Sequence, residues 1–247
     1  ALDPRESHDF TGNLIIQQVF EPPYRRRDDG SFEPILLEGP LVEARVRTGV
    51  QYHAKVRPGL KFSDGSELTA KDVVQALRLL PALDDFMLQA DGPLLIIRPR
   101  GASTRRPEEV LSDRVACVVK ESGQHLLGTG PFFIESADSH CVKLRRNPHS
   151  RASASVDAAE IRYYPSSPGG NPDALLDALS SGACDLSIAL SPDGKPLSIL
   201  KAGDTRPARV ARGDDYVKIG FIAGRLDKAE KRAHILEGLR IALGEID

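Results

Sequence analysis

One stretch of the chain does most to decide the fold, and it reads VRPGLKFSDGSELTAKDV over residues 56–73. Its Asp64-Gly65 pair predicts a tight turn, because glycine accepts a positive φ angle at little cost. Thr69 and Asp72 have the i, i+3 spacing of a capping box, with aspartate in place of the usual glutamate. The apolar residues that follow recur at helical spacing before Pro81, at Val73, Val74, Leu77 and Leu80. The stretch therefore predicts a turn and then a capped helix with one apolar face.

The segments on either side predict a mixture of short helices and strands. A helix predicted over residues 11–20 ends at Pro22-Pro23, because proline has no backbone donor. Residues 50–56 alternate between apolar and polar, which indicates a half-buried strand. The middle of the chain predicts strands and turns, with one short helix at residues 107–111. The last hundred residues predict the strand–helix–strand order of an α/β unit, over 161–164, 171–179, 185–190, 216–222 and 226–243.

Length and composition indicate an ordinary globular chain. The 247 residues carry 33 Lys and Arg against 35 Asp and Glu, a formal net charge of −2, and 40% of them are hydrophobic. A chain of this length can bury a large core without metal or disulfide staples, and its near-neutral charge lacks the footprint of a general nucleic-acid binder. No apolar run approaches the ~18 residues that span a bilayer. The first residue is Ala1 rather than Met, so we expect a removed leader or a cut segment.

The chain has three widely spaced cysteines, Cys117, Cys141 and Cys184. They form no CxxC pair, which argues against a zinc knuckle. The pattern favours buried thiols, with one disulfide as the alternative.

Several short motifs, in the same order along the chain, resemble those of the family 5 extracellular solute-binding proteins, which are the peptide- and nickel-binding receptors of ABC importers. The most recognisable lies in the stretch quoted above, at residues 56–65 and 68–73. The sequence GTGPF at 128–132 resembles a second motif, and RNP at 146–148 a third. Weaker matches lie at residues 1–4, 20–21, 178–185, 239–243 and 246–247. Because the matches are collinear over nearly the whole chain, they indicate common descent, although fold does not fix function.

The resemblance implies an α/β (α+β) fold class, in the form of a periplasmic-binding-protein-like lobe with an inserted β-rich subdomain. Residues 1–40 and 152–247 would form the main α/β part of this first lobe, and residues 41–151 the inserted subdomain. In the family a second lobe follows the helix at which this sequence ends, so we expect the second lobe to be absent. Family members close two lobes over a ligand and remove it from water. We therefore expect this chain to bind peptides weakly or not at all.

The resemblance also points to ligand-binding residues. In the family, the segment after the opening Asp-Pro lies along the cleft and gives backbone contacts to extended ligands. This segment corresponds to His8, Asp9 and Phe10. A late strand also borders the cleft, which adds Tyr216. The residues alone favour an exposed loop at 8–10, and they are equally consistent with a core strand at Tyr216.

Three other features have simple interpretations. The GTG run at residues 128–130 lacks the GxxxxGK[ST] pattern of a phosphate loop. The His-Cys pair at 140–141 has ligand types that suit transition metals, but its spacing to other ligands fits no metal motif. The arginines at 25–27 are largely offset by the aspartates at 28–29. Since neither a GxSxG elbow nor HExxH is present, we expect no catalytic residues, no metal site and no cofactor.

These observations predict a non-catalytic lobe that captures a solute, preferably a peptide, for an ABC importer. Its partners would be the ligand and the importer's membrane subunits, with no nucleic acid and no transmembrane segment. It would be periplasmic or extracellular, with or without a lipid anchor. Departures from the family pattern at residues 36–40, 149–151 and Ile222 favour an alternative, in which the lobe is a sensing or protein-interaction module, for example in a cytoplasmic regulator.

Overall fold

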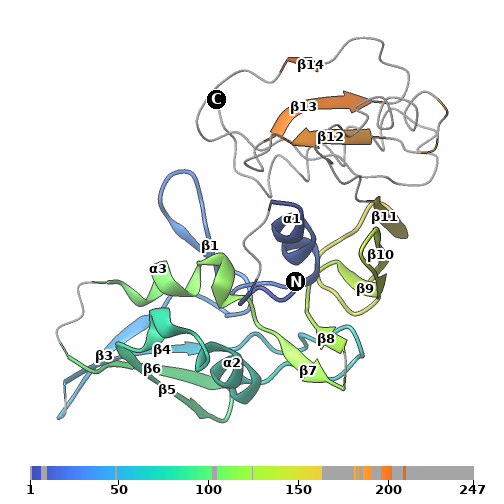
Figure 1. Ribbon diagram of the computed structural model, residues 1–247. Coiled ribbons are helices and arrows are strands. Elements are labelled where there is room, and N and C mark those ends of the chain that lie inside the picture. The colour runs from blue at the N-terminus through green and yellow to red at the C-terminus, as the bar shows by residue number, and fades with distance from the viewer. Residues whose placement is uncertain are drawn as a thin grey trace. The chain divides into compact units, whose positions relative to one another are not determined.

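The computed structural model describes residues 2–6, 10–47, 49–101, 105–123, 125–162, 181, 183, 186–190, 196–201 and 208–209 (Figure 1). The described helices are α1 (Phe10–Val19), α2 (Ala70–Leu77) and α3 (Pro107–Leu111), with short 3₁₀ helices η1 (Pro81–Leu83) and η2 (Arg114–Ala116). The described strands are β1 (Tyr24–Arg26), β2 (Phe32–Pro34), β3 (Val42–Val46), β4 (Gly49–Lys55), β5 (Phe86–Asp91), β6 (Leu94–Pro99), β7 (Lys120–Ser122), β8 (His125–Leu127), β9 (Phe132–Ala137), β10 (Cys141–Arg146), β11 (Ala158–Arg162), β12 (Leu186–Leu190), β13 (Pro196–Lys201) and β14 (Ala208–Arg209).

The chain divides into two compact units. Unit 1 comprises Ala1–Phe133 and Asn147–Ser153, and unit 2 comprises Ile134–Arg146 and Ala154–Asp247. Unit 1 contains the stretch at residues 56–73 and most of the described motifs. It is therefore the unit that positions the candidate site.

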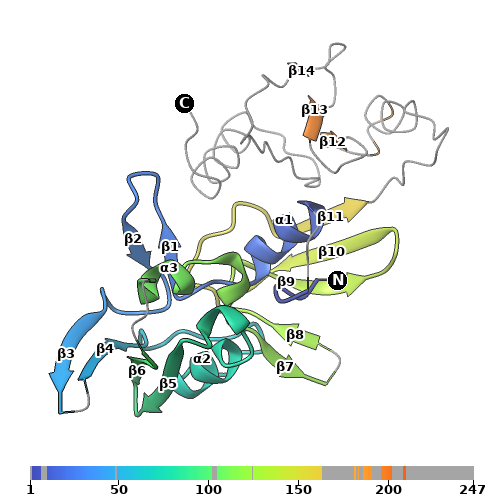
Figure 2. The ribbon, with the colours of Figure 1, turned by 60° about the vertical axis from the view of Figure 1, so that its left-hand side comes forward.

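Unit 1 is built on a four-stranded antiparallel sheet in the order β3-β4-β6-β5 (Figure 2). Tyr52 lies opposite Ile97 and Ala54 opposite Leu95, and these residues share one face because side chains alternate along a strand. Helix α2 packs against β5 and β6. The core forms between the helix and this face of the sheet, with buried side chains that include Val73, Leu77, Phe86, Leu95 and Ile97.

Helix α2 begins as the sequence predicts. Thr69 Oγ1 accepts a hydrogen bond from the Asp72 backbone N–H at 3.3 Å, and Asp72 Oδ2 accepts one from the Thr69 backbone N–H at 2.8 Å, so the capping box is confirmed. The prediction that the helix continues to Leu80 is wrong, because it ends at Leu77. Leu80 is extended, with φ −98° and ψ 116°, since the ring of Pro81 disfavours helical backbone in the residue before it.

The other described elements of unit 1 follow the sequence closely. Helix α1 covers the predicted 11–20 helix to within one residue, and α3 has the predicted bounds. The charged turn between β1 and β2 closes through Gly30, whose φ is 78° and whose N–H donates to Arg27 O at 2.9 Å. Asp29 Oδ1 accepts a hydrogen bond from the Ser31 N–H at 2.8 Å, so this segment is a surface turn.

Unit 2 contains two small antiparallel sheets, β11-β10-β9 and β12-β13-β14. In the first, Leu144 lies opposite Ala159, and both side chains are buried. The predicted strand at residues 161–164 begins earlier, because β11 starts at Ala158 to pair with Arg145. The predicted strand at residues 185–190 is confirmed by β12.

Several predictions lie outside the described residues and stay predictions. They are the helices at 171–179 and 226–243 and the strand at 216–222. The division into residues 1–40 with 152–247 and residues 41–151 is likewise untested. None of the described helices has the length and apolar character needed to cross a membrane.

The described cysteines are not bonded to each other. Cys117 is buried, as predicted, whereas Cys141 is only partly buried, and Cys184 lies outside the described residues. Cys141 Sγ donates to Glu160 Oε1 at 3.5 Å, because the two residues lie on the adjacent strands β10 and β11.

Candidate functional site

The structure defines the chain on both sides of the predicted ligand segment. His8, Asp9 and Tyr216 lie outside the described residues. Phe10 is the first residue of α1, and its side chain lies outside them too. The structure therefore does not show whether these residues come together, and all four ligand-binding assignments stay predictions.

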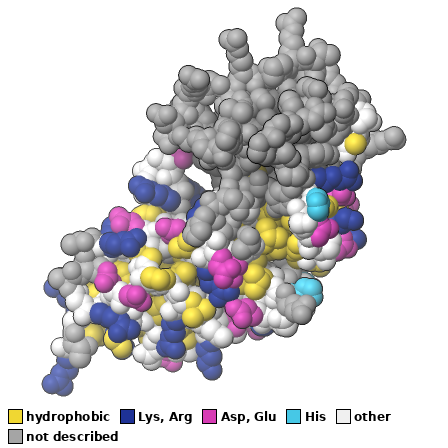
Figure 3. Space-filling view, in the orientation of Figure 1, with side chains coloured by type: hydrophobic (Ala, Val, Ile, Leu, Met, Phe, Trp, Pro, Cys, Tyr) yellow, Lys and Arg dark blue, Asp and Glu magenta, His cyan; other side chains and the backbone are white. Residues whose placement is uncertain are grey.

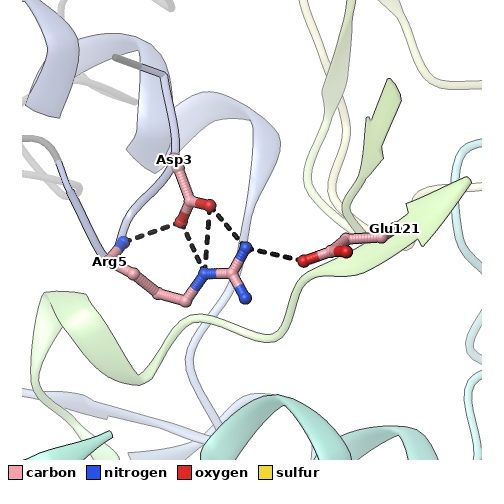
Figure 4. Close-up of polar contacts among 3 residues, drawn as sticks. All are labelled: Asp3, Arg5 and Glu121. Carbon is pink, nitrogen blue, oxygen red and sulfur yellow. Dashed lines mark hydrogen bonds and ion pairs between the residues drawn. The ribbon is translucent and has the colours of Figure 1, made fainter. Parts of the chain in front are cut away.

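An ion-pair cluster fixes the chain before this segment, and Figure 4 shows its three residues, Asp3, Arg5 and Glu121. Arg5 Nε donates to the two carboxylate oxygens of Asp3 at 2.8 and 3.0 Å, and the Arg5 backbone N–H donates to Asp3 Oδ1 at 2.9 Å. Arg5 Nη2 also donates to Glu121 Oε1 at 2.9 Å. Glu121 lies in β7, 116 residues further along the chain. The cluster therefore ties the opening residues to the β7–β8 hairpin.

The charges in this cluster stabilise one another. Partial burial raises the pKa of Asp3, but the hydrogen bonds from Arg5 outweigh it, and the net pKa of Asp3 lies below its ordinary value. The hydrogen bond to Asp3 raises the pKa of Arg5. The side chains of Asp3 and Arg5 are 13% and 24% exposed, whereas Glu121 is 65% exposed. The Asp3–Arg5 pair is therefore better shielded from solvent than the Arg5–Glu121 pair, and salt weakens it less.

Helix α1 holds the chain after the segment. Ile15, Ile16 and Val19 have no exposed surface, so one face of the helix is fully packed. The Phe20 N–H donates to Ile16 O at 2.8 Å and extends the hydrogen bonding by one residue beyond the helix. The predicted ligand segment at residues 8–10 is thus joined to an ion-pair cluster on one side and to a packed helix on the other.

The family-like motifs meet at a second place, which we call the motif junction and define as Glu21, Gly128, Thr129, Gly130 and Asn147. Two of its residues are glycines because the end of α1 leaves no room for a side chain. A Cβ added at Gly128 would lie 2.0 Å from Val19 O, and one at Gly130 would lie 2.6 Å from Gln18 O. The Gly130 N–H donates to Val19 O at 3.0 Å, so the second motif lies directly against the helix end.

Thr129 links the second motif to Glu21, which follows Phe20 just after the end of α1. Its hydroxyl donates to Glu21 Oε2 at 2.7 Å, and its carbonyl accepts a hydrogen bond from Ser150 Oγ at 2.9 Å. Burial raises the pKa of Glu21 above its ordinary value, although the Thr129 hydrogen bond and the charges of Arg25 and Arg151 act in the opposite direction. The junction therefore holds a carboxyl group that is easier to protonate than an exposed glutamate.

Asn147 links the third motif to the second. Its Nδ2 donates to Gly130 O at 2.9 Å, and its Oδ1 accepts a hydrogen bond from the His149 N–H at 2.9 Å. Its backbone N–H donates to Pro131 O at 2.8 Å. With the side chain only 4% exposed, Asn147 makes its contacts inside the protein and not with solvent.

The stretch at residues 56–73 reaches the motif junction as well. The Ser63 N–H donates to Gly128 O at 3.0 Å. His149 covers the tight turn next to it, since a Cβ added at Gly65 would lie 3.1 Å from His149 Nε2. Gly65 itself has a φ of 85°, which confirms the predicted turn. Lys120 Nζ donates to Ser66 Oγ at 2.8 Å, so the turn is held from β7 as well.

These contacts give the motifs a structural role. Thr129 is 2% exposed. The Thr129 hydroxyl and the Asn147 side-chain amide are both hydrogen-bonded to other protein groups. The run at residues 128–130 faces the end of α1, which agrees with the prediction that it is not a phosphate loop. Within the described ranges, no three His, Cys, Asp or Glu side chains gather as metal ligands. Burial raises the pKa of the Cys117 thiol, which makes it a poor nucleophile.

Surface charge is mixed on the face of unit 1 that Figure 3 shows, where Lys and Arg side chains alternate with Asp and Glu side chains. This agrees with the nearly balanced formal charge of −2. On this face, the described side chains form no continuous basic patch.

Sequence reasoning missed the ion-pair cluster. Asp3 and Arg5 are only two residues apart, so a local pair was open to prediction. Glu121 carried no such signal, because its contact with Arg5 exists only after β7 has folded against the opening residues.

Comparisons with known proteins identify the fold. No protein-family model matches this sequence, and no curated protein does. The chain is similar to the crystal structure of an ABC transporter substrate-binding protein from Sinorhizobium meliloti, with 20% identity, a TM-score of 0.62, and coverage of 78% of this chain and 43% of that one. It is also similar to a nickel ABC transporter protein from Bacillus halodurans (21%, 0.59, 78% and 41%). A third similar structure is Listeria monocytogenes OppA bound to peptide (15%, 0.61, 78% and 45%).

This likeness confirms the predicted fold class and, at the level of fold, the resemblance to solute-binding proteins. The chain has the mixed α/β, periplasmic-binding-protein-like fold of ABC-transporter substrate-binding proteins. It spans less than half the length of the structures it matches. At identities of 21% or lower, the likeness shows the fold and leaves ligand and partner open.

Proposed function

We propose that this chain supplies a ligand-binding lobe of a receptor that captures a solute for an ABC importer. The observation that carries the proposal is the fold, because 78% of the chain aligns with substrate-binding proteins at TM-scores near 0.6. The activity is non-catalytic capture outside the cytoplasmic membrane, in the periplasm or the extracellular space. The partners are the solute and the importer's membrane subunits.

A peptide is the ligand class that we propose. One of the similar structures, OppA from Listeria monocytogenes, is bound to peptide. The resemblance implies that residues 8–10 lie along the cleft; this segment follows the Asp3–Arg5 pair, and its last residue, Phe10, begins α1. An extended peptide binds a protein backbone as an added strand, and fixed backbone donors and acceptors lower the entropy cost of that pairing. The ion-pair cluster thus supports peptide binding by holding the chain next to the predicted contacts.

The alternative, a sensing or protein-interaction module, rests on departures from the family pattern. Two of them have packing explanations. Leu36 and Leu37 stand at the first departure and are fully buried in the core of unit 1. His149 stands at the second and covers the Gly65 turn. Ile222 lies outside the described residues. The departures therefore give less support to the alternative than the fold gives to a receptor lobe.

Calorimetric titration of this chain with a pool of di- to pentapeptides tests the proposal, with a nickel–histidine mixture as the comparison ligand. The chain spans at most 45% of the length of the structures above, so we expect weak peptide binding or none. A Kd at or above about 0.1 mM is expected, because hydrogen bonds left open to water contribute little net free energy. Nanomolar binding would show that one lobe suffices. Saturation by nickel–histidine alone would replace the peptide assignment.

A further inference from the structure

One edge of the unit 1 sheet is open to solvent. β3 is an end strand of the order β3-β4-β6-β5, and among the described strands it pairs with β4 alone. Figure 2 shows it at the margin of the sheet. Val42 and Val46, near its two ends, are 63% and 38% exposed. An end strand presents unpaired backbone N–H and C=O groups that another strand can bind.

The opposite edge of the same sheet is protected. Two arginines donate to backbone carbonyls of the end strand β5, Arg78 Nη2 to Leu88 O at 3.3 Å and Arg100 Nε to Phe86 O at 3.4 Å. Side chains that bind the outward carbonyls of an end strand cover that edge and hinder pairing with another strand. Among the described residues, no side chain makes such a contact with the β3 backbone, so the two edges differ in availability.

The sequence of β3 is complementary to itself. The strand reads VEARV, with Ala44 at its centre. In an antiparallel pair centred on Ala44, Val42 lies opposite Val46 of the other strand and Glu43 lies opposite Arg45. We propose that β3 pairs in this register with β3 of a second copy of this chain. The pairing is isologous, because the same patch is used twice around a two-fold axis.

The backbone geometry agrees with this register. In an antiparallel ladder, alternate residues direct their N–H and C=O groups to the same side of the strand. Glu43 and Arg45 therefore share one direction, and Val42, Ala44 and Val46 share the other. Centring on Ala44 pairs members of one set only with members of the same set. Whichever set faces outward from β4, its groups meet outward-facing groups of the second copy.

The side chains gain partners in the same arrangement. Within one strand, Arg45 Nε lies 3.6 Å from Glu43 Oε1, with side chains 88% and 50% exposed. Such an exposed pair contributes little on its own. Across the two-fold axis each arginine faces a glutamate directly, and opposite charges at facing positions favour one register over others. The exposed valines meet on the other face of the sheet, which removes apolar surface from water.

The dimer is weak and depends on concentration. A stable protein interface buries at least about 1,000 Å² of total surface, which is more than two five-residue strands cover. We therefore expect self-association in the range of about 10 µM to 1 mM, and monomers below it.

Sedimentation equilibrium of this chain and its variants tests the pairing. Glu43→Arg places arginine opposite arginine in a homodimer, and Arg45→Glu places glutamate opposite glutamate, so each variant alone is expected to stay monomeric. In an equimolar mixture, one strand carries two arginines and the other two glutamates. The mixture is therefore expected to form a heterodimer at least as readily as the wild-type chain self-associates. Asp91→Arg, on the protected edge, makes the same charge change as Glu43→Arg and is expected to dimerise normally.

Three results would overturn the proposal. The first is a wild-type chain that stays monomeric up to 1 mM, and the second is a single variant that self-associates as the wild type does. The third is a mixture that remains monomeric, because the register predicts full charge complementarity between the two variants. Circular dichroism of each variant checks that the exposed substitutions leave the fold intact.

Discussion

The motif junction and the β3 edge belong to the same unit but constrain the sequence very differently. At the junction, Thr129 and Asn147 are 2% and 4% exposed, and the end of α1 leaves no space for a Cβ at Gly128. At the edge, Val42 is 63% exposed and the Arg45 side chain 88% exposed. Few residue types fit the junction, so its sequence is recognisable as a motif. The motifs that reveal this fold therefore report packing, and we expect the residues that decide binding to lie elsewhere.

The largest effect is expected from Gly128→Ala at the motif junction. The new Cβ would lie 2.0 Å from the backbone oxygen of Val19, which cannot move without displacing α1. We expect a loss of about 3 kcal/mol or more in the free energy of unfolding, measured by urea denaturation. Gly101→Ala is the matched control, since a Cβ at Gly101 meets no atom within 4 Å. Equal stability of the two variants would show that the close approach at the junction is absent.

The next effect is expected from Asn147→Ala. This change leaves Gly130 O and the His149 N–H without their side-chain partner in a buried place. We expect a destabilisation of about 1–3 kcal/mol by urea denaturation. Asn13→Ala serves as the control, because Asn13 Oδ1 is buried without a hydrogen-bond partner among the described residues and its removal is expected to be nearly neutral. If Asn13→Ala were the more harmful change, the role given to Asn147 would be wrong.

A smaller effect on stability distinguishes the ion-pair cluster of Asp3, Arg5 and Glu121 from the β3 edge. Arg5→Ala removes a partly shielded pair with Asp3, and we expect it to lower the free energy of unfolding by about 1 kcal/mol. Arg45→Ala removes the exposed pair with Glu43, and its effect is expected to be close to zero. Measuring both variants at low and high salt would separate the two ion pairs, since the Arg5 effect should persist in salt. A larger loss of unfolding free energy from Arg45→Ala than from Arg5→Ala would contradict this ranking.

The smallest effect concerns the pH dependence at Glu21. Burial raises the pKa of this carboxyl in the folded protein, so the folded state binds its proton more readily than the unfolded state. Ionised Glu21 therefore opposes folding at neutral pH, and this cost disappears as pH falls below the ordinary value of 4.5. Glu21→Gln keeps an oxygen that can accept the Thr129 hydrogen bond but carries no charge.

We expect Glu21→Gln to be more stable than the wild-type chain at pH 7 and to lose this advantage towards pH 4. Thermal unfolding across this range measures the difference. An advantage that grows as pH falls would show that the pKa of Glu21 is lowered in the folded protein.

The sequence predicted the parts of the fold that depend on local chemistry. The capping box at Thr69, the turn at Gly65 and the helix at residues 107–111 follow from short-range rules and are all confirmed. The end of α2 was predicted three residues late, because the apolar spacing continues through Leu80 although Pro81 forces that residue to be extended.

The candidate site was less predictable for a physical reason. The resemblance assigned ligand contacts at residues 8–10 and Tyr216, and these stay predictions. The Arg5–Glu121 ion pair had no signal, because it joins residues 116 positions apart. The motif junction was visible as separate motifs, but periodicity and spacing did not show that Glu21, Thr129 and Asn147 meet, since that depends on tertiary packing.

We propose that ligand contacts lie at residues 8–10 and Tyr216, whereas the family-like motifs hold the lobe together. Amide NMR spectra of this chain, titrated with di- to pentapeptides up to millimolar concentration, test it directly, because chemical shifts detect weak binding residue by residue. We expect shifts that saturate at His8, Asp9, Phe10 and Tyr216, with Thr129 and Asn147 unchanged. Shifts centred on the motif junction, or saturating shifts that leave the four predicted residues unchanged, would contradict the claim.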